Sequence, residues 1–365
     1  MPVPDPDDAI ANAPRPKPTQ VLVLSEVPGV LDALRACVPA REAEFFQHTP
    51  ATVTTQTLMC FEVIVADPPS FARCADRCAK GALRWVQSTF AGVDALTRRG
   101  ANREYALTRL GGVFGDKMAE YCVMHVLALE RDMARDRENQ SAAVWDRGGA
   151  SDASNRKPYR SLRDLVVGIL GFGEIGARVG EVFAHMGARV VACRRRSGTG
   201  LGSDVAMWEE SQDALPRYVA ECFGAGDDPN RFFAQCDVVV NLLPSTPETV
   251  GVLDADTLTR VFKDGSILIN VGRGDVFGAT HDACEQTLLT AADDPRGAKH
   301  FVLDVFATEP LPKSSALWAH PSITITPHVA AVTDARDVAR AFAANLERYR
   351  DGKQLRHVVD WAKGY

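Results

Sequence analysis

The sequence lacks several features that mark common classes of protein. Its most apolar segment, YCVMHVLAL at 121–129, is far shorter than the roughly 20 residues that a membrane-spanning helix needs. The net charge of −6 gives no electrostatic reason to expect nucleic acid or an anionic membrane as a partner. The nine cysteines are scattered and do not occur at zinc-ligand spacings. We therefore expect a reduced, cytoplasmic protein without a metal site.

Neither end of the chain matches a targeting signal. Residues 1–18 combine prolines and aspartates without an apolar run, so they predict a disordered tail rather than a signal peptide. The C-terminal KGY matches no peroxisomal or ER-retention signal. The 365 residues are too many for one ordinary core, and this length predicts two domains.

Short apolar runs recur along the chain and predict strands. Most of them are continuously apolar rather than alternating, which is typical of strands buried on both faces of a parallel sheet. Because segments of helical composition separate the runs, we expect an α/β fold with two doubly wound parallel-sheet domains. The runs lie at 21–24, 61–66, 84–87, 165–170, 189–192, 237–243, 266–270, 301–305 and 323–326.

One helix is predicted from about Asp116 to Arg135 and is apolar on nearly all sides through 121–129. Such a helix needs a cover on more than one face. Packing within the chain and contact with a second subunit both satisfy this need. The segment that follows the helix contains Trp145, which favours a subunit interface.

A glycine-rich turn follows the apolar run that ends at residue 170. The pattern Gly171-x-Gly173-x-x-Gly176 leads into a helix that begins with Glu174 and Ile175. In such turns the first glycine allows a tight bend, the second lets the backbone approach a pyrophosphate, and the third lets helix and strand pack closely. The helix N-terminus offers unpaired N–H groups to the phosphates. Strand, glycines, helix and a second strand occur in order, so they predict a dinucleotide site.

The end of the second strand differs from the usual pattern of such sites. An acid that binds the ribose 2′-hydroxyl is expected there, about 20 residues after the glycines. The sequence instead has Arg194, Arg195, Arg196 and Ser197. A guanidinium cannot accept the hydrogen bond of the hydroxyl, but it binds a 2′-phosphate through forked, charge-assisted contacts. The arginines therefore predict NADP(H) in preference to NAD(H), with a solvated basic loop as the alternative.

Three stretches with polar side chains follow strands in the C-terminal half: NVGRGDVF at 270–277, LDVFATEPLP at 303–312 and ITPHVAAVT at 325–333. Ligands of doubly wound sheets bind at the carboxyl ends of strands. Arg273 can bind a small carboxylate by forked contacts or form a structural salt bridge. Glu309 and His328 together suggest a carboxylate that orients an imidazole and raises its pKa.

Over roughly residues 80–340 these motifs and their order resemble the D-isomer-specific 2-hydroxyacid dehydrogenases. The resemblance implies an active site formed by Arg273, Glu309 and His328. It also implies a substrate loop in LRWVQSTFAGVD at 83–94, whose backbone amides bind the substrate carboxylate. The residues of that loop implied to do so are Ala91, Gly92 and Val93. The further cofactor contacts implied are Leu243, Pro244, Thr249, Val271, Gly272, Asp304 and His328.

The resemblance also implies an architecture. A Rossmann nucleotide-binding domain, residues 118–329, is expected to be inserted into a flavodoxin-like substrate domain made of residues 19–117 and 330–365, and two such chains are expected to form a homodimer. The stretch ALWAHPSITITPHVAAVT and the basic strand end are most similar to the glyoxylate/hydroxypyruvate reductase branch.

Two features depart from the family pattern. Phe277-Gly278 replaces an acidic residue that is usual shortly after GRGxxV, close to Arg273, which bears on substrate preference. The segment TAADDPRGAKH, ending at residue 300, is longer than usual and predicts a longer surface loop.

The predicted function is NADPH-dependent reduction of a small 2-oxo acid, of the glyoxylate or hydroxypyruvate type, to the D-2-hydroxy acid, with His328 as proton donor. One alternative is a dinucleotide-sensing, corepressor-like protein on the same fold. Another is an NAD-linked formate or phosphite dehydrogenase. Both alternatives would favour NAD(H) and therefore an acid in place of Arg194.

Overall fold

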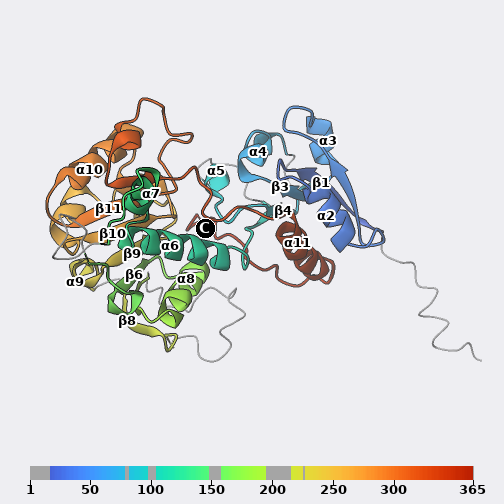
Figure 1. The fold of residues 1–365 in the computed structure, drawn as a ribbon. Helices are drawn as coiled ribbons and strands as arrows, with labels where there is room; N and C mark the ends of the chain where they lie inside the picture. The colour runs from blue at the N-terminus through green and yellow to red at the C-terminus, as the bar shows by residue number, and fades with distance from the viewer. Residues whose placement is uncertain are drawn as a thin grey trace, which may run out of the picture. The chain divides into compact units, whose positions relative to one another are not determined.

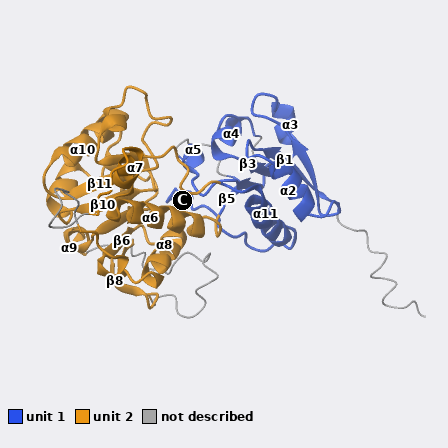
Figure 2. Ribbon diagram, viewed as in Figure 1, with its two compact units in different colours: residues 1–110, 333–365 blue, residues 111–332 orange. Residues whose placement is uncertain are grey.

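The chain divides into two compact units (Figure 2), residues 1–110 with 333–365 and residues 111–332. Each unit is built on one sheet with helices packed against it (Figure 1). All strand pairs within the two sheets are parallel, which confirms the predicted fold class. The structure is a computed structural model that describes residues 17–78, 82–97, 104–147, 158–194, 215–224 and 227–364.

The first unit has a five-stranded sheet with the order β2-β1-β3-β4-β5, which is the flavodoxin-like order. The last helix, α11, returns to this unit and packs against α2. The elements are β1 Thr19–Leu24, α2 Val30–Cys37, β2 Ala43–Gln47, α3 Thr55–Met59, β3 Val63–Ala66, α4 Pro68–Ala72, η1 Ala75–Arg77, β4 Trp85–Ser88, α5 Asp94–Thr97, β5 Ala106–Thr108 and α11 Ala335–Arg350.

The second unit has a seven-stranded sheet with the order β12-β11-β10-β9-β6-β7-β8. Starting from β6, the order reverses between β6 and β9, as in a Rossmann fold. The elements are α6 Gly115–Glu130, α7 Met133–Ser141, η2 Leu162–Asp164, β6 Val166–Leu170, α8 Glu174–His185, β7 Arg189–Cys193, β8 Val219–Phe223, α9 Pro229–Gln235, β9 Val238–Asn241, η3 Thr257–Val261, β10 Ser266–Asn270, η4 Gly274–Phe277, α10 His281–Asp293, β11 Ala298–Leu303, η5 Ala316–Ala319 and β12 Ile323–Ile325.

The seven-stranded sheet separates two hydrophobic cores. Val238 and Val240 of β9 belong to one core together with α6 and α8, whereas Val239 belongs to the other together with α9 and α10. Because side chains alternate between the faces of a strand, burial on both faces requires a continuous apolar run. All nine strands predicted from such runs are present, and the structure adds β2, β5 and β8.

One expectation about local structure is wrong, and a second is right only in part. The helix predicted from Asp116 to Arg135 is interrupted at Asp132, whose φ of +55° is left-handed, so that α6 and α7 are separate helices. The longer segment before β11 is a loop only at 294–297, because its ends belong to α10, which ends at Asp293, and to β11, which starts at Ala298. The tail predicted over residues 1–18 lies outside the described residues up to residue 16.

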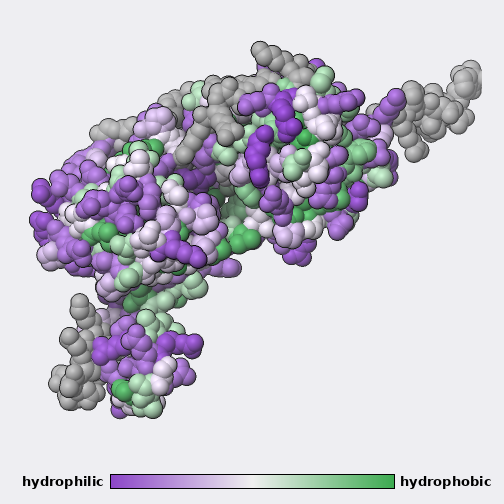
Figure 3. All heavy atoms as spheres, turned by 90° about the horizontal axis from the view of Figure 1, so that it is seen from above, coloured by the Kyte–Doolittle hydropathy of each residue, from purple (hydrophilic) through white to green (hydrophobic). Residues whose placement is uncertain are grey.

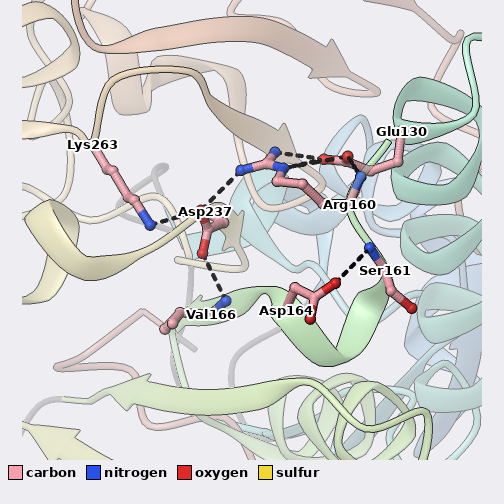
Figure 4. Close-up of polar contacts among 7 residues, drawn as sticks. All are labelled: Glu130, Arg160, Ser161, Asp164, Val166, Asp237 and Lys263. Atoms are coloured by element: carbon pink, nitrogen blue, oxygen red, sulfur yellow. Dashed lines mark hydrogen bonds and ion pairs between the residues drawn. The ribbon is translucent and has the colours of Figure 1, made fainter. Parts of the chain in front are cut away.

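A network of four charged side chains holds the amino edge of the seven-stranded sheet (Figure 4). Arg160 forms ion pairs with Glu130, at the end of α6, and at 2.9 Å with Asp237, just before β9. Lys263, just before β10, also pairs with Asp237 at 2.8 Å. The other oxygen of Asp237 accepts the N–H of Val166 at 2.9 Å. Two cations and two anions therefore neutralise one another where three strands begin.

The face of the molecule in Figure 3 mixes hydrophilic and hydrophobic side chains, with hydrophilic ones in the majority. Twelve large apolar side chains of the described residues are exposed, and five of them lie between residues 124 and 159: Met124, Met133, Val144, Trp145 and Tyr159. Trp145 is the most exposed of these at 88%. In the described part of the chain no helix is long and apolar enough to span a membrane.

Candidate active site

His328 and Glu309 form a close pair at the carboxyl edge of the seven-stranded sheet. Nδ1 of His328 lies 2.8 Å from Oε2 of Glu309. A carboxylate only accepts hydrogen bonds, so Nδ1 carries the proton in this contact. The other ring nitrogen, Nε2, has no hydrogen-bond partner among the described residues and is the atom that can face a substrate. The structure thus joins two predicted residues that lie 19 positions apart in sequence.

Each member of this pair shifts the pKa of the other. The hydrogen bond to Glu309 raises the pKa of His328 above its usual value, although burial and the nearby Arg273 act to lower it. Burial acts to raise the pKa of Glu309, but the hydrogen bonds from His328 and from the Phe306 N–H hold it below its usual value. Glu309 is therefore ionised near neutral pH and favours the imidazolium form of its partner.

The loop that carries His328 is held by the buried carboxyl group of Asp304, which directly follows β11. One oxygen accepts the Thr326 hydroxyl at 2.5 Å and the Val329 N–H at 2.8 Å, and the other accepts the Ala330 N–H at 2.9 Å. The backbone of His328 is left-handed, with φ of +56°, which is uncommon for a residue other than glycine. The three hydrogen bonds to Asp304 therefore stabilise an unfavourable local backbone that aims the imidazole.

Arg273 stands between two glycines that pack against neighbouring loops. A Cβ atom on Gly272 would lie 2.7 Å from the carbonyl oxygen of Leu243, and one on Gly274 would lie 2.1 Å from the carbonyl carbon of Phe306. The arginine is thus fixed between the loops that follow β9 and β11, the two neighbours of β10. One of its guanidinium nitrogens donates to the Gly272 carbonyl at 2.7 Å, and a guanidinium carries five N–H donors in a fork that suits a carboxylate.

Two buried asparagines that the sequence analysis missed organise this edge. Asn241 ends β9 and Asn270 ends β10, and their side chains are joined by a hydrogen bond of 2.8 Å. Asn270 also donates to the carbonyl of Arg273 at 3.0 Å, and Asn241 accepts the N–H of Leu243 at 3.2 Å. Their signal in the sequence is a single polar residue that ends an otherwise apolar run.

The glycine turn has the geometry that a dinucleotide requires. Gly171 has a φ of +97°, and a Cβ there would lie 2.9 Å from the backbone of Leu242. A Cβ on Gly176 would lie 2.5 Å from the Gly171 carbonyl oxygen, whereas nothing lies within 4 Å of the corresponding position at Gly173. The first and third glycines are therefore required by packing, and the second leaves open space at the N-terminus of α8. Glu174 and Ile175 form the first turn of that helix.

Arg194 lies beside this turn. The carbonyl of Cys193, the preceding residue and the last of β7, accepts the N–H groups of both Gly171 and Phe172 at 3.0 Å. The structure describes no side chains for the other residues of the basic strand end, because Arg195, Arg196 and Ser197 lie outside the described residues. No acid occupies the position after β7.

The remaining cofactor contacts implied by sequence lie at the same edge. Leu243 and Pro244 follow β9, and the Thr249 hydroxyl donates to the Pro244 carbonyl at 2.6 Å. Val271 follows β10, and its N–H donates to the Asn241 carbonyl at 3.2 Å. Their contacts with a cofactor stay a prediction, as does that of Asp304, whose two oxygens already accept three hydrogen bonds from the chain.

The substrate loop predicted at Ala91, Gly92 and Val93 lies in the first unit, between β4 and α5. Val93 is buried at 2% exposure, whereas Ala91 and Gly92 are partly exposed. In the second unit, Phe277, which replaces the usual acid, is buried at 3% in the core beside α10. A Cβ on Gly278 would approach that of Ala283 in α10 to 2.8 Å.

Comparisons with known proteins agree with this geometry. The family model described as "D-isomer specific 2-hydroxyacid dehydrogenase, NAD binding domain" matches residues 123–330, more than half of the chain. The crystal structure of a D-isomer specific 2-hydroxyacid dehydrogenase family protein from Aeromonas salmonicida is 30% identical in sequence, with a TM-score of 0.76, over 94% of this chain and 99% of that one. The chain belongs to the D-isomer specific 2-hydroxyacid dehydrogenase family.

Two further solved members of this family were determined with bound nucleotide. An NADPH-dependent glyoxylate/hydroxypyruvate reductase from Sinorhizobium meliloti, in complex with NADP and sulfate, is 26% identical over 95% of this chain and 100% of that one, with a TM-score of 0.74. A probable 2-hydroxyacid dehydrogenase from Rhizobium etli, in complex with NADP, HEPES and L(+)-tartaric acid, is 25% identical over 96% and 100%, with a TM-score of 0.75. The protein is accordingly an NAD(P)-dependent oxidoreductase.

Proposed function

We propose that this dehydrogenase uses NADPH to reduce a small 2-oxo acid, of the glyoxylate or hydroxypyruvate type, to the D-2-hydroxy acid. The observation that carries the proposal is the Glu309–His328 pair, 2.8 Å apart, at the sheet edge that also holds Arg273 and the glycine turn. The choice of acid is supported by the S. meliloti reductase, whose reported substrates are of this type.

Each polar side chain has a distinct task in this reaction. When bound, the reduced nicotinamide supplies the hydride that adds to the carbonyl carbon of the substrate. His328 in its protonated form donates a proton to the carbonyl oxygen, and Glu309 holds the ring through Nδ1. Arg273 binds the substrate carboxylate by forked contacts and polarises the carbonyl group. In the reverse direction, neutral His328 accepts the proton of the 2-hydroxyl group.

A kinetic assay of the purified protein tests the proposal directly. NADPH and NADH would each be offered with a panel of 2-oxo acids, and oxidation of the nicotinamide followed by absorbance. We expect turnover of short 2-oxo acids, with a higher kcat/KM for NADPH. Activity only with NAD+ and formate or phosphite would contradict the proposal, and so would nucleotide binding without any turnover.

The preference for NADPH rests on the basic strand end. We propose that Arg194 and Arg195 bind the 2′-phosphate, so that neutralising both should weaken NADPH binding by about 2–3 kcal/mol and leave NADH nearly unchanged. Arg189→Ala is the matched control, because Arg189 begins the same strand at the opposite edge and pairs there with Glu221. Equal losses for NADPH and NADH, measured by fluorescence titration, would argue against this assignment.

We further propose that the protein is a cytoplasmic homodimer. The five exposed apolar side chains between residues 124 and 159, with Trp145 at 88% exposure, support a surface covered by a second copy. None of the nine cysteines forms a disulfide, which suits a reducing compartment. Light scattering at micromolar concentration should give the mass of a dimer, and a monomer would contradict the proposal. Trp145→Ser should weaken the dimer, whereas Trp318→Ser, outside this stretch, should not.

A further inference from the structure

A second buried aspartate occupies the carboxyl edge of the five-stranded sheet. Asp67 directly follows β3, the strand between β1 and β4, and is 5% exposed. Its Oδ1 accepts the hydroxyls of Ser25 at 2.6 Å and Thr89 at 2.5 Å, and its Oδ2 accepts the Glu26 N–H at 2.6 Å. One carboxylate thus joins the loops that follow β1 and β4.

No cation accounts for the burial of this acid. Within the described ranges, Asp67 has no lysine or arginine partner, and its three donors are two hydroxyls and one backbone N–H. Burying a charged group is costly unless hydrogen bonds satisfy it. Hydrogen bonds to a charged group are stronger than neutral ones and fix the positions of their donors. The arrangement therefore fixes where the two loops leave the sheet.

The loop after β4 is the one predicted to bind substrate, and Thr89 is its first residue. Thr89 is fully buried, and only Phe90 separates it from Ala91. The Phe90 N–H donates to the Ser88 hydroxyl at 3.0 Å, and the Phe90 carbonyl accepts the Leu110 N–H at 3.0 Å. Through its side chain, Thr89 connects this segment to the end of the neighbouring strand β3, because its hydroxyl donates to Asp67.

We propose that Asp67 is a positioning residue, which through Thr89 holds the Ala91–Val93 backbone in the geometry that binds the substrate carboxylate. The inference rests on the proposed function of the loop. Asp67 should affect substrate binding only through the loop after β4, because the other loop that it joins, at Ser25 and Glu26, has no proposed contact with substrate.

Two matched substitutions separate positioning from general stability. Thr89→Val removes one hydroxyl from Asp67 with little change in shape, and Ser25→Ala removes a hydroxyl from the same oxygen on the other loop. Ser25→Ala is the harsher structural change, because its hydroxyl also accepts the Val27 N–H at 3.1 Å. We expect Thr89→Val to raise KM for the 2-oxo acid about tenfold, the effect of one hydrogen bond to a charged group. Ser25→Ala should stay within about twofold of wild type, and Thr89→Ser should restore the lower KM.

A second measurement does not depend on activity. Amide hydrogen exchange of residues 90–93 should be faster in Thr89→Val than in the wild type and in Ser25→Ala. NADPH binding should be the same in all variants. The proposal is overturned if both variants raise KM equally, or if Thr89→Val changes neither KM nor exchange. If the wild type reduces no 2-oxo acid, the proposed function fails, while the exchange measurement still decides whether Asp67 holds the loop.

Discussion

The two edges of the seven-stranded sheet each bury an aspartate, and the two carboxylates are satisfied in different ways. Asp237 at the amino edge pairs with two cations, Arg160 and Lys263. Asp304 at the carboxyl edge accepts one hydroxyl and two backbone N–H groups, and it has no lysine or arginine partner in the described part of the chain. Ion pairs therefore compensate the buried acid at the amino edge, whereas a hydroxyl and backbone N–H groups satisfy the buried acid at the carboxyl edge.

This difference indicates that the amino edge contributes to stability and the carboxyl edge to the proposed chemistry. Ion pairs at the amino edge hold the starts of strands together. At the carboxyl edge, the hydrogen bond to Glu309 raises the pKa of His328 and the charge of Asp304 adds to this effect, against burial and Arg273. The acids of this edge thus favour the protonated form that the proposed reduction requires. Asp67 in the other unit is of the same type, because only hydroxyl and N–H groups satisfy it.

The largest expected effect comes from removing the imidazole at the carboxyl edge. His328→Ala should lower kcat by roughly 10²–10⁴-fold in both directions, the usual contribution of a positioned proton donor. NADPH binding and thermal stability should be retained. His320→Ala is the control, because His320 also faces a carboxylate, Asp293 at 3.3 Å, but has no role in the proposed site. A similar loss in both variants, measured by steady-state kinetics, would remove His328 from the mechanism.

The opposite result is expected at the amino edge. Asp237→Ala leaves Arg160 and Lys263 without this partner and the Val166 N–H unpaired, so the free energy of unfolding should fall by about 2–3 kcal/mol. The loss stays below that of a fully buried pair because both cations are partly exposed, at 37% and 44%. Lys263→Met, which removes only an exposed partner, should cost under about 1 kcal/mol.

Denaturant unfolding and kinetics together test this second prediction. Because Asp237 lies at the edge away from the proposed chemistry, kcat and KM of the folded Asp237→Ala protein should equal those of the wild type. A lower kcat without a loss of stability would mean that the two edges are not separated in function.

The sequence predicted the strands of the sheet interiors and not those at most edges. Strands buried on both faces, such as β9 with its run of valines, need continuous apolar residues and are visible as such. The three missed strands, β2, β5 and β8, all lie at sheet edges. In β2 and β8, buried and exposed residues are mixed, so their sequences resemble those of ordinary loops. An edge strand forms by pairing with a neighbouring strand, and the sequence of the edge segment alone does not show that partner.

The sequence predicted which residues form the candidate site, but not the contacts that hold them in place. The order of Arg273, Glu309 and His328 after successive strands indicated one edge, and the structure brings Glu309 and His328 within 2.8 Å. The left-handed backbone of His328 and the hydrogen bonds from Asn270 and Asp304 depend on tertiary contacts across loops. The only sign of these contacts in the sequence is a single Asn or Asp at the end of an apolar run.

A smaller loss is expected when the guanidinium at the carboxyl edge is changed. Arg273→Lys keeps the charge but removes the fork, so KM for the 2-oxo acid should rise about tenfold and kcat should fall, with NADPH binding nearly unchanged. Because Gly272 and Gly274 hold the backbone at this position, the substitution should not displace the loop. Unchanged kinetics would assign Arg273 to a structural ion pair instead.

The smallest expected effect is a shift of pH dependence at the Glu309–His328 pair. Glu309 raises the pKa of His328, so Glu309→Gln should lower it. Reduction requires protonated His328 and falls as pH rises through its pKa, so this alkaline limb should move to lower pH. Oxidation of the 2-hydroxy acid requires neutral His328 and rises through the same pKa, so its acid limb should also move to lower pH. Asp293→Asn, at the His320 pair, should leave both profiles unchanged. If the limbs of Glu309→Gln coincide with those of the wild type, Glu309 does not tune His328.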